Sequence, residues 1–94
     1  MPQKKVFKTE DVVALYLCKT FNLKQMPKIK EIVEFLLGSA SNFDYSNEAT
    51  MNQIHEKLIK QFEWLGSLRY NRKELEKWLE NIIRTHGSAL TLEK

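Results

Sequence analysis

The side chains with the greatest chemical potential in this sequence are one thiol and two imidazoles, Cys18, His55 and His86. A thiol beside an imidazole forms a nucleophile with its base, and convergent imidazoles, thiolates and carboxylates bind transition metals. The spacing favours neither kind of site. Ile59 follows four residues after His55, and Cys18 lies in an apolar stretch, where an isolated cysteine behaves as a small hydrophobic side chain. We therefore expect no metal, no cofactor and no enzymatic activity.

The three glycines, Gly38, Gly66 and Gly87, are too far apart to form a phosphate-binding loop. Each is better placed to end a helix, because glycine readily adopts the left-handed backbone that follows the last helical turn. Neighbouring carboxylates such as Glu31 and Glu34 lie opposite the apolar positions of their segment and are predicted to be solvated helix surface. Nucleotide hydrolysis is therefore not indicated.

The net charge of +3 is distributed unevenly along the chain. Residues 1–30 contain seven lysines and two acidic residues, a balance of +5. Residues 31–94 contain eight basic and ten acidic residues, a balance of −2. The basic N-terminal third is either a solvated surface or a docking surface for a phosphate backbone or an acidic protein.

Five side chains in and after this basic third are the partner-binding site that the sequence predicts: Lys24, Lys28, Lys30, Phe43 and Tyr45. The two aromatic residues lie in a polar loop and would serve as anchors, with the lysines as a charged rim. The alternative for the two aromatic side chains is that they fold back and cover the core. The predicted partner is a protein or a nucleoprotein.

Nucleic-acid binding is the second hypothesis. Gly66 separates two expected helices, and Arg69, Arg72 and Lys73 stand at the start of the second one, as in a helix-turn-helix. The connection is somewhat long, however, and three glutamates in the same helix would place negative charge near phosphates. A small DNA-binding or transcription-modulating domain that uses these three basic residues remains the alternative.

The length and composition limit the number of domains and the fold class that can position these residues. Ninety-four residues, of which 43% are hydrophobic, suffice for one core and leave no room for a second domain. Three glycines and two prolines are too few for a small all-β domain, which needs turn residues about every 8 to 12 positions. The sequence therefore predicts an all-α protein, a single compact four-helix domain packed as a bundle or an orthogonal array.

Capping residues and apolar spacing predict helices over residues 9–21, 27–37, 47–65 and 72–85, with a frayed tail over 88–94. Thr9 is expected to cap the first helix, and Asn71 with Glu74 to form a capping box before the fourth. Residues 12–17 would also fit a buried strand, but no partner strand is evident elsewhere, so we prefer a helix.

The single cysteine cannot form an internal disulfide, which favours the reducing cytoplasm. Met1–Lys8 is polar and basic rather than signal-like, and no segment approaches the roughly 18 apolar residues that cross a bilayer. We therefore expect a soluble, cytoplasmic protein without a membrane partner. The wide apolar stripes of the expected helices leave homodimerisation open.

Parts of the chain resemble small phage-encoded proteins of unknown function, namely Phe7, Thr9, Asp11 and Val12, residues 29–38 and residues 58–65. The resemblance covers about residues 7–65. The sequence departs from those proteins in the loop after Gly38, and its last expected helix has no counterpart there. The resemblance implies no functional residues, but it implies a phage or prophage setting, where short proteins often inhibit host or defence machinery. The resulting hypothesis is a non-enzymatic phage-type inhibitor or adaptor that occludes a macromolecule of the host cell.

Overall fold

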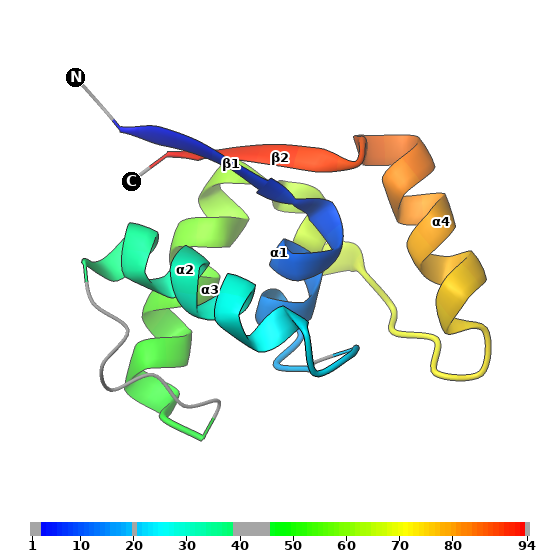
Figure 1. Ribbon diagram of the computed structural model, residues 1–94, viewed down its shortest axis with the longest axis horizontal. Coiled ribbons are helices and arrows are strands. Elements are labelled where there is room, and N and C mark those ends of the chain that lie inside the picture. The colour runs from blue at the N-terminus through cyan, green and yellow to red at the C-terminus, as the bar shows by residue number, and fades with distance from the viewer. Residues whose placement is uncertain (1–2, 20, 39–45, 94) are drawn as a thin grey trace.

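The computed structural model describes residues 3–19, 21–38 and 46–93 (Figure 1). Its elements are β1 (Lys4–Lys8), α1 (Thr9–Tyr16), α2 (Gln25–Leu37), α3 (Glu48–Gln61), the 3-10 helix η1 (Glu63–Ser67), α4 (Leu75–His86) and β2 (Ala89–Glu93). In Figure 1, α1 lies among the sheet, α2 and α3, whereas α4 stands at one end of the molecule. The central place of α1 agrees with its burial, because Val12, Val13, Ala14 and Leu15 are all fully buried.

The prediction of an all-α fold is wrong, because β1 and β2 pair as a two-stranded antiparallel sheet. Phe7 lies opposite Leu90 in the register of this pair. Phe7, Leu90 and Leu92 are buried against the helices, whereas Val6 faces solvent. The tail predicted to fray over 88–94 therefore contains a strand, whose alternate leucines close the core. The described residues therefore form a mixed α/β domain, with four α-helices and one two-stranded sheet.

Thr9 joins the start of α1 to the end of α4. The cap position of α1 is Lys8 rather than Thr9, and it makes no side-chain capping bond. Thr9 is fully buried, its hydroxyl donates to the carbonyl of Gly87 at 2.6 Å, and its amide donates to the carbonyl of Ser88 at 3.0 Å. These two bonds join the end of β1 to the start of β2.

The first helix, predicted over 9–21, ends early at a sharp turn around Cys18. Cys18 has a left-handed backbone with φ 57°. The amide of Cys18 donates to the carbonyl of Leu15 at 3.2 Å, and the amide of Lys19 donates to that of Ala14 at 2.9 Å. This pair of bonds is a Schellman motif, which terminates a helix. The motif was hidden in the sequence because glycine, its usual residue, is absent from this turn.

The second and third helices lie where the apolar spacing predicts them, with different ends. The helix predicted over 27–37 begins at Gln25 and ends as predicted at Gly38, whose φ is 85°. The helix predicted over 47–65 is divided into α3 and η1, because the backbone of Phe62 (φ −136°, ψ 83°) leaves the helical region.

The fourth helix, predicted over 72–85, begins at Leu75 and ends at His86. The side chain of Asn71 accepts a hydrogen bond from the amide of Glu74 at 3.1 Å, which is one half of the predicted capping box. Only Ile82 of its apolar stripe is buried. The helix is thus more peripheral than its strong apolar periodicity indicates.

A Thr9→Val variant tests the junction between the chain ends. We expect it to lower the free energy of unfolding by about 1 to 2 kcal/mol, since the shape is kept while the Gly87 carbonyl loses its donor. Urea unfolding followed by circular dichroism measures this change. Thr91→Val on the exposed face of the sheet is the control and should change stability by less than ~0.5 kcal/mol. Equal effects of both variants would refute the role of Thr9.

Candidate functional site

The structure brings together Cys18 and His55, which lie far apart in the sequence. The Sγ of Cys18 is 3.7 Å from the Nε2 of His55, whose ring packs on Tyr16 with the centroids 5.0 Å apart. Partial burial raises the pKa of the Cys18 thiol above its ordinary value, and the ammonium of Lys19 lowers it by a smaller amount. An activated nucleophile needs the opposite shift. The contact is therefore better explained as packing of the turn after α1 on α3.

The other imidazole, His86, stacks on the ring of Trp64 with the centroids 3.8 Å apart. Within residues 3–19, 21–38 and 46–93, no three His, Cys, Asp or Glu side chains converge to hold a metal ion. No helix in the described part of the chain is long and apolar enough to cross a membrane.

Three half-buried aromatic rings join the turn after α1 to the start of α4. Phe21 stacks on Tyr70 and meets Trp78 edge-on, with centroids 6.3 Å apart in both pairs. The ammonium of Lys19 lies 4.8 Å from the centre of the Tyr70 ring. Because these rings contact one another, they hold α4 in place rather than form an open aromatic site.

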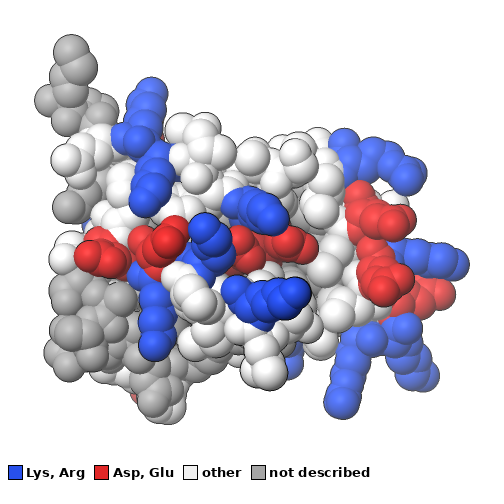
Figure 2. All heavy atoms as spheres, in the orientation of Figure 1, with Lys and Arg blue, Asp and Glu red and all other residues white. Residues whose placement is uncertain are grey.

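The residues of the nucleic-acid hypothesis, Arg69, Arg72 and Lys73, are exposed just before α4. Residues 62–74 separate α3 from α4, which is much longer than the turn of about 3 to 4 residues in a helix-turn-helix. Positive and negative side chains are interleaved at the end of the molecule where α4 stands (Figure 2). Nucleic-acid binding through these three residues stays a prediction.

The structure places two of the five predicted partner-binding residues in one groove. Lys24 and Lys28, at the start of α2, line this groove, whereas Lys30 is exposed on the same helix and does not. Phe43 and Tyr45 lie outside the described residues.

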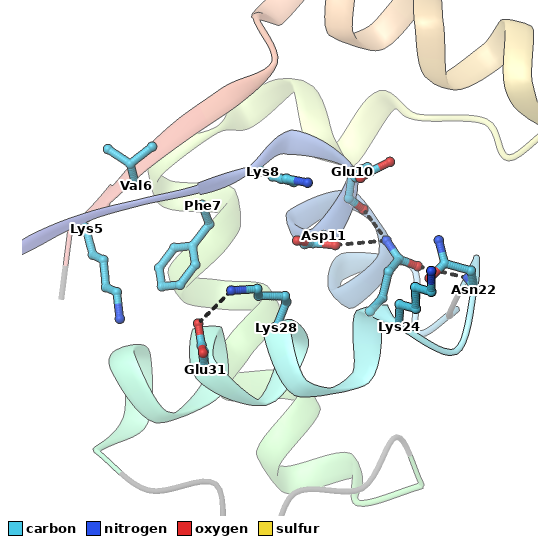
Figure 3. A pocket seen from close by; sticks show the side chains of 11 residues that line it. Lys5, Val6, Phe7, Lys8, Glu10, Asp11, Asn22, Lys24, Lys28 and Glu31 are labelled. Carbon is cyan, nitrogen blue, oxygen red and sulfur yellow. Dashed lines mark hydrogen bonds and ion pairs between the residues drawn. The ribbon is translucent and has the colours of Figure 1, made fainter.

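The groove lies between β1 and the first half of α2 and has a volume of about 550 Å³ (Figure 3). We call it the β1–α2 groove. Its lining consists of residues 5–8 of β1, Glu10 and Asp11 of α1, and Asn22, Lys24, Gln25, Lys28 and Glu31. In Figure 3 the side chain of Lys5 extends from β1 toward α2, whereas Val6 points to the opposite side of the strand.

Gln25 is the buried centre of this groove, with only 4% of its surface exposed. Its Nε2 donates to the Oδ1 of Asp11 at 3.0 Å and to the carbonyl of Glu10 at 3.4 Å. Its Oε1 accepts from the amides of Phe21 at 2.7 Å and Asn22 at 3.2 Å. The side chain therefore ties the segment before α2 to the first turn of α1 and sets how the groove walls are spaced.

Two of the carboxylates in the groove already have partners. Asp11 is 4% exposed and held by Gln25, and Glu31 lies 3.9 Å from the ammonium of Lys28. The Asp11 carboxylate stands in the first turn of α1, where the unpaired amides and the helix dipole favour negative charge. Glu31 and Lys28 therefore offset each other's charge, whereas Asp11, bonded by a neutral amide, keeps its negative charge at the floor of the groove.

The other three lysines of the groove, Lys5, Lys8 and Lys24, form no ion pair within the described residues. All three are exposed. Lys5 lies over the ring of Phe7, with its nitrogen 5.4 Å from the ring centre. Glu10 is the one lining carboxylate among the described residues without a side-chain partner. The lining has four lysines and three carboxylates, a net charge of +1, and the three exposed lysines outnumber the half-buried Glu10 at its rim, which suits an acidic ligand.

Comparison of the chain with protein-family models, with curated proteins and with solved structures finds no match. The function of the groove must therefore be inferred from its own geometry. The resemblance to small phage-encoded proteins stays a prediction.

Sequence reasoning missed the β1 side of the groove. Lys5 and Lys8 were treated as part of a basic N-terminal end without a defined structure, because a strand was not expected there. One signal was present in the sequence, since Leu90 and Leu92 alternate with small or polar residues in the manner of a half-buried strand. A half-buried strand needs a pairing partner, and the segment around Phe7 is a candidate for it.

A Gln25→Met variant tests whether this side chain holds the groove together. The variant keeps the length of the side chain but leaves a buried carboxylate and two amides without their partner. We expect the free energy of unfolding to fall by about 2 to 4 kcal/mol. Gln53→Met, at an exposed position of α3, is the control for the same exchange. Equal unfolding midpoints for the two variants would contradict the role assigned to Gln25.

The raised pKa of Cys18 predicts slow alkylation by iodoacetamide at neutral pH, because only the thiolate reacts. The sign follows from burial, which favours the neutral thiol and shifts the titration to higher pH. The rate of modification, followed by mass spectrometry, should stay below that of a free cysteine peptide and keep rising beyond the pH at which the peptide levels off. A rate at pH 7 above that of the peptide would instead indicate an activated thiolate.

Proposed function

We propose that this chain is a small non-enzymatic binding protein whose β1–α2 groove docks an acidic region of a protein partner. The observation that carries the proposal is a set of three exposed ammonium groups, those of Lys5, Lys8 and Lys24, which form no ion pair with any described residue and surround a groove with a buried polar floor. Charges at the rim of an interface steer a complementary partner toward it and disfavour partners of the same sign.

The lining of the groove supports binding rather than catalysis. Among the described residues it contains no Ser, Thr, Cys, His or Tyr side chain, and two of its three carboxylates, Asp11 and Glu31, are already bonded to Gln25 and Lys28. The thiol of Cys18 is directed at His55, outside the groove, and its pKa is raised. These features support the proposal that the protein acts by binding its partner and not by catalysing a reaction.

We further propose, on the resemblance to small phage-encoded proteins, that the partner is a host or defence macromolecule that this protein occludes as an inhibitor or adaptor. The single cysteine supports a cytoplasmic setting, where thiols stay reduced. The alternative, a DNA-binding domain that uses Arg69, Arg72 and Lys73, has no favouring observation beyond the exposure of these residues.

The test of the proposal is a double charge reversal, Lys24→Glu with Lys28→Glu. Tagged wild-type and variant proteins are incubated with lysate of the source cells, with and without nuclease treatment, and captured proteins are quantified by mass spectrometry. We expect the variant to retain less than about a tenth of the partner, because groove charges that attracted it now repel it. Circular dichroism confirms that the variant is folded.

The matched control reverses two exposed lysines outside the groove, Lys57→Glu with Lys77→Glu, which changes the net charge by the same amount. This control should capture the partner as the wild type does. Equal loss in both double variants would show that net charge alone governs capture and would contradict the groove. Loss of every partner on nuclease treatment would favour the nucleic-acid alternative instead.

A further inference from the structure

β1 has one edge paired with β2 and another edge beside the groove. The bond from the amide of Thr9 to the carbonyl of Ser88 marks a hydrogen-bonded pair of the antiparallel register. Such pairs alternate along a ladder with pairs that exchange no hydrogen bond, and Lys8 and Val6 belong to the second kind. The backbone amide and carbonyl groups of Lys8 and Val6 therefore point away from β2, toward the open edge.

The corresponding edge of β2 is bonded by α3 at one residue, Glu93. The amide of Glu93 donates to the Oε1 of Gln61 at 2.7 Å, and the Nε2 of Gln61 donates to the carbonyl of Glu93 at 2.8 Å. The side-chain amide of Gln61 thus takes the place of a neighbouring strand. Within the part of the chain that the structure describes, no group bonds the outward backbone of Val6 or Lys8 in this way.

The charges on the open edge disfavour a second copy of this chain as its occupant. Antiparallel pairing of two β1 strands centred on Val6 would place Lys4 of one copy, whose ammonium lies 3.4 Å from the carboxylate of Glu93 in its own chain, opposite Lys8 of the other copy, which forms no ion pair within the described residues. Like charges directly opposite each other destabilise a strand pair. Lysines on an edge strand are a common means by which proteins prevent such pairing between copies. A strand with carboxylates at these positions meets attraction instead.

We propose that an extended acidic segment of a partner protein adds to β1 as a third strand of the sheet. This inference rests on the proposed function and specifies how the groove would hold its partner. The outward backbone groups of Val6 and Lys8 supply the hydrogen bonds, and the side chains of Lys5 and Lys24 receive carboxylates on the groove side. Val6, which is 60% exposed, contacts an apolar side chain of the added strand. The recognised pattern is an apolar residue with Glu or Asp on both sides.

A capped peptide, Thr-Glu-Glu-Val-Glu-Glu-Thr, is the probe, because its sequence reads the same in either strand direction. The matching peptide with lysine in place of glutamate is the charge control. In titrations of isotope-labelled protein, we expect the acidic peptide to shift the amide signals of Val6 and Lys8 and to slow their hydrogen exchange. The amide of Thr91, on the opposite edge, should not change. Absence of these shifts at millimolar peptide would overturn the inference.

A Val6→Pro variant tests the backbone contribution directly. Proline is tolerated at an edge position whose amide faces away from the ladder, so this exchange removes one outward donor while β1 and β2 stay paired. We expect the peptide to bind about tenfold more weakly, since the loss of one interfacial hydrogen bond corresponds to that factor. Val6→Thr, which keeps the amide, should bind within about twofold of the wild type.

Thr91→Pro makes the same change on the outer edge of β2 and should leave peptide binding unaltered. If Val6→Pro does not fold by circular dichroism, an N-methylated peptide replaces it. Methylation must be at every residue of the peptide, because alternate methylation would block only one of its two edges. The fully methylated peptide keeps every charge but has no amide to donate to β1, so its affinity should be lost. Binding of the methylated peptide as tightly as the parent peptide would overturn the strand-addition inference.

The outcomes separate this inference from the proposed function. If Val6→Pro binds the peptide normally while Lys24→Glu with Lys28→Glu does not, the groove binds through side chains alone. The strand inference then fails and the proposed function stands. If the charge-reversed protein captures its partner from lysate as the wild type does, the proposed function itself fails.

Discussion

The antiparallel pairing of β1 with β2 joins elements from opposite ends of the chain, and the β1–α2 groove exists only because of this pairing. Bringing such distant segments together has an entropic cost, and the part of this cost that grows with loop length is about 4 kcal/mol. Burial of Phe7, Leu90 and Leu92 contributes about 1.5 to 3 kcal/mol for each side chain and so outweighs this cost. The bonds of Thr9 to Gly87 and Ser88 define where the pairing starts. Without the pairing, β1 would not lie over α2 and one wall of the groove would be missing.

The four helices could be predicted because their signals are local. Apolar residues at helical spacing, Gly38 after α2 and the bond between Asn71 and Glu74 all act within a few residues of chain. The sheet could not be predicted in the same way, because neither strand is convincing without the other. β1 contains a single buried residue, Phe7, and its lysines suggested a solvated end. The early end of α1 could not be predicted either, since the left-handed turn lies at Cys18 and not at a glycine, the usual sequence signal for such a turn.

The same division between local and long-range signals decided which residues of the candidate site could be predicted. Lys24 and Lys28 were identified from their charge and their place on an expected helix, and both line the groove. Lys5 and Lys8 required the sheet, so they entered the site only with the structure. Gln25 gave no sequence signal, because its role comes from hydrogen bonds to residues on α1 and in the loop before α2. Site residues that act through long-range contacts are thus the ones that a local pattern does not reveal.

The two edges of the sheet avoid unwanted pairing by different physical means. At β2, the neutral side-chain amide of Gln61 is part of the same chain and bonds both backbone groups of Glu93, so another strand would have to displace it at that residue. At β1, exposed lysines discourage another strand by charge, while the backbone groups of Val6 and Lys8 stay available. A backbone group that is already hydrogen-bonded disfavours every added strand equally, whereas the lysine charges disfavour only strands that carry positive charge. At physiological ionic strength, screening acts over about 8 Å, so contacts inside the groove keep most of this discrimination. The lysines of β1 therefore discriminate between strands by charge, and they favour an acidic strand over a neutral or basic one.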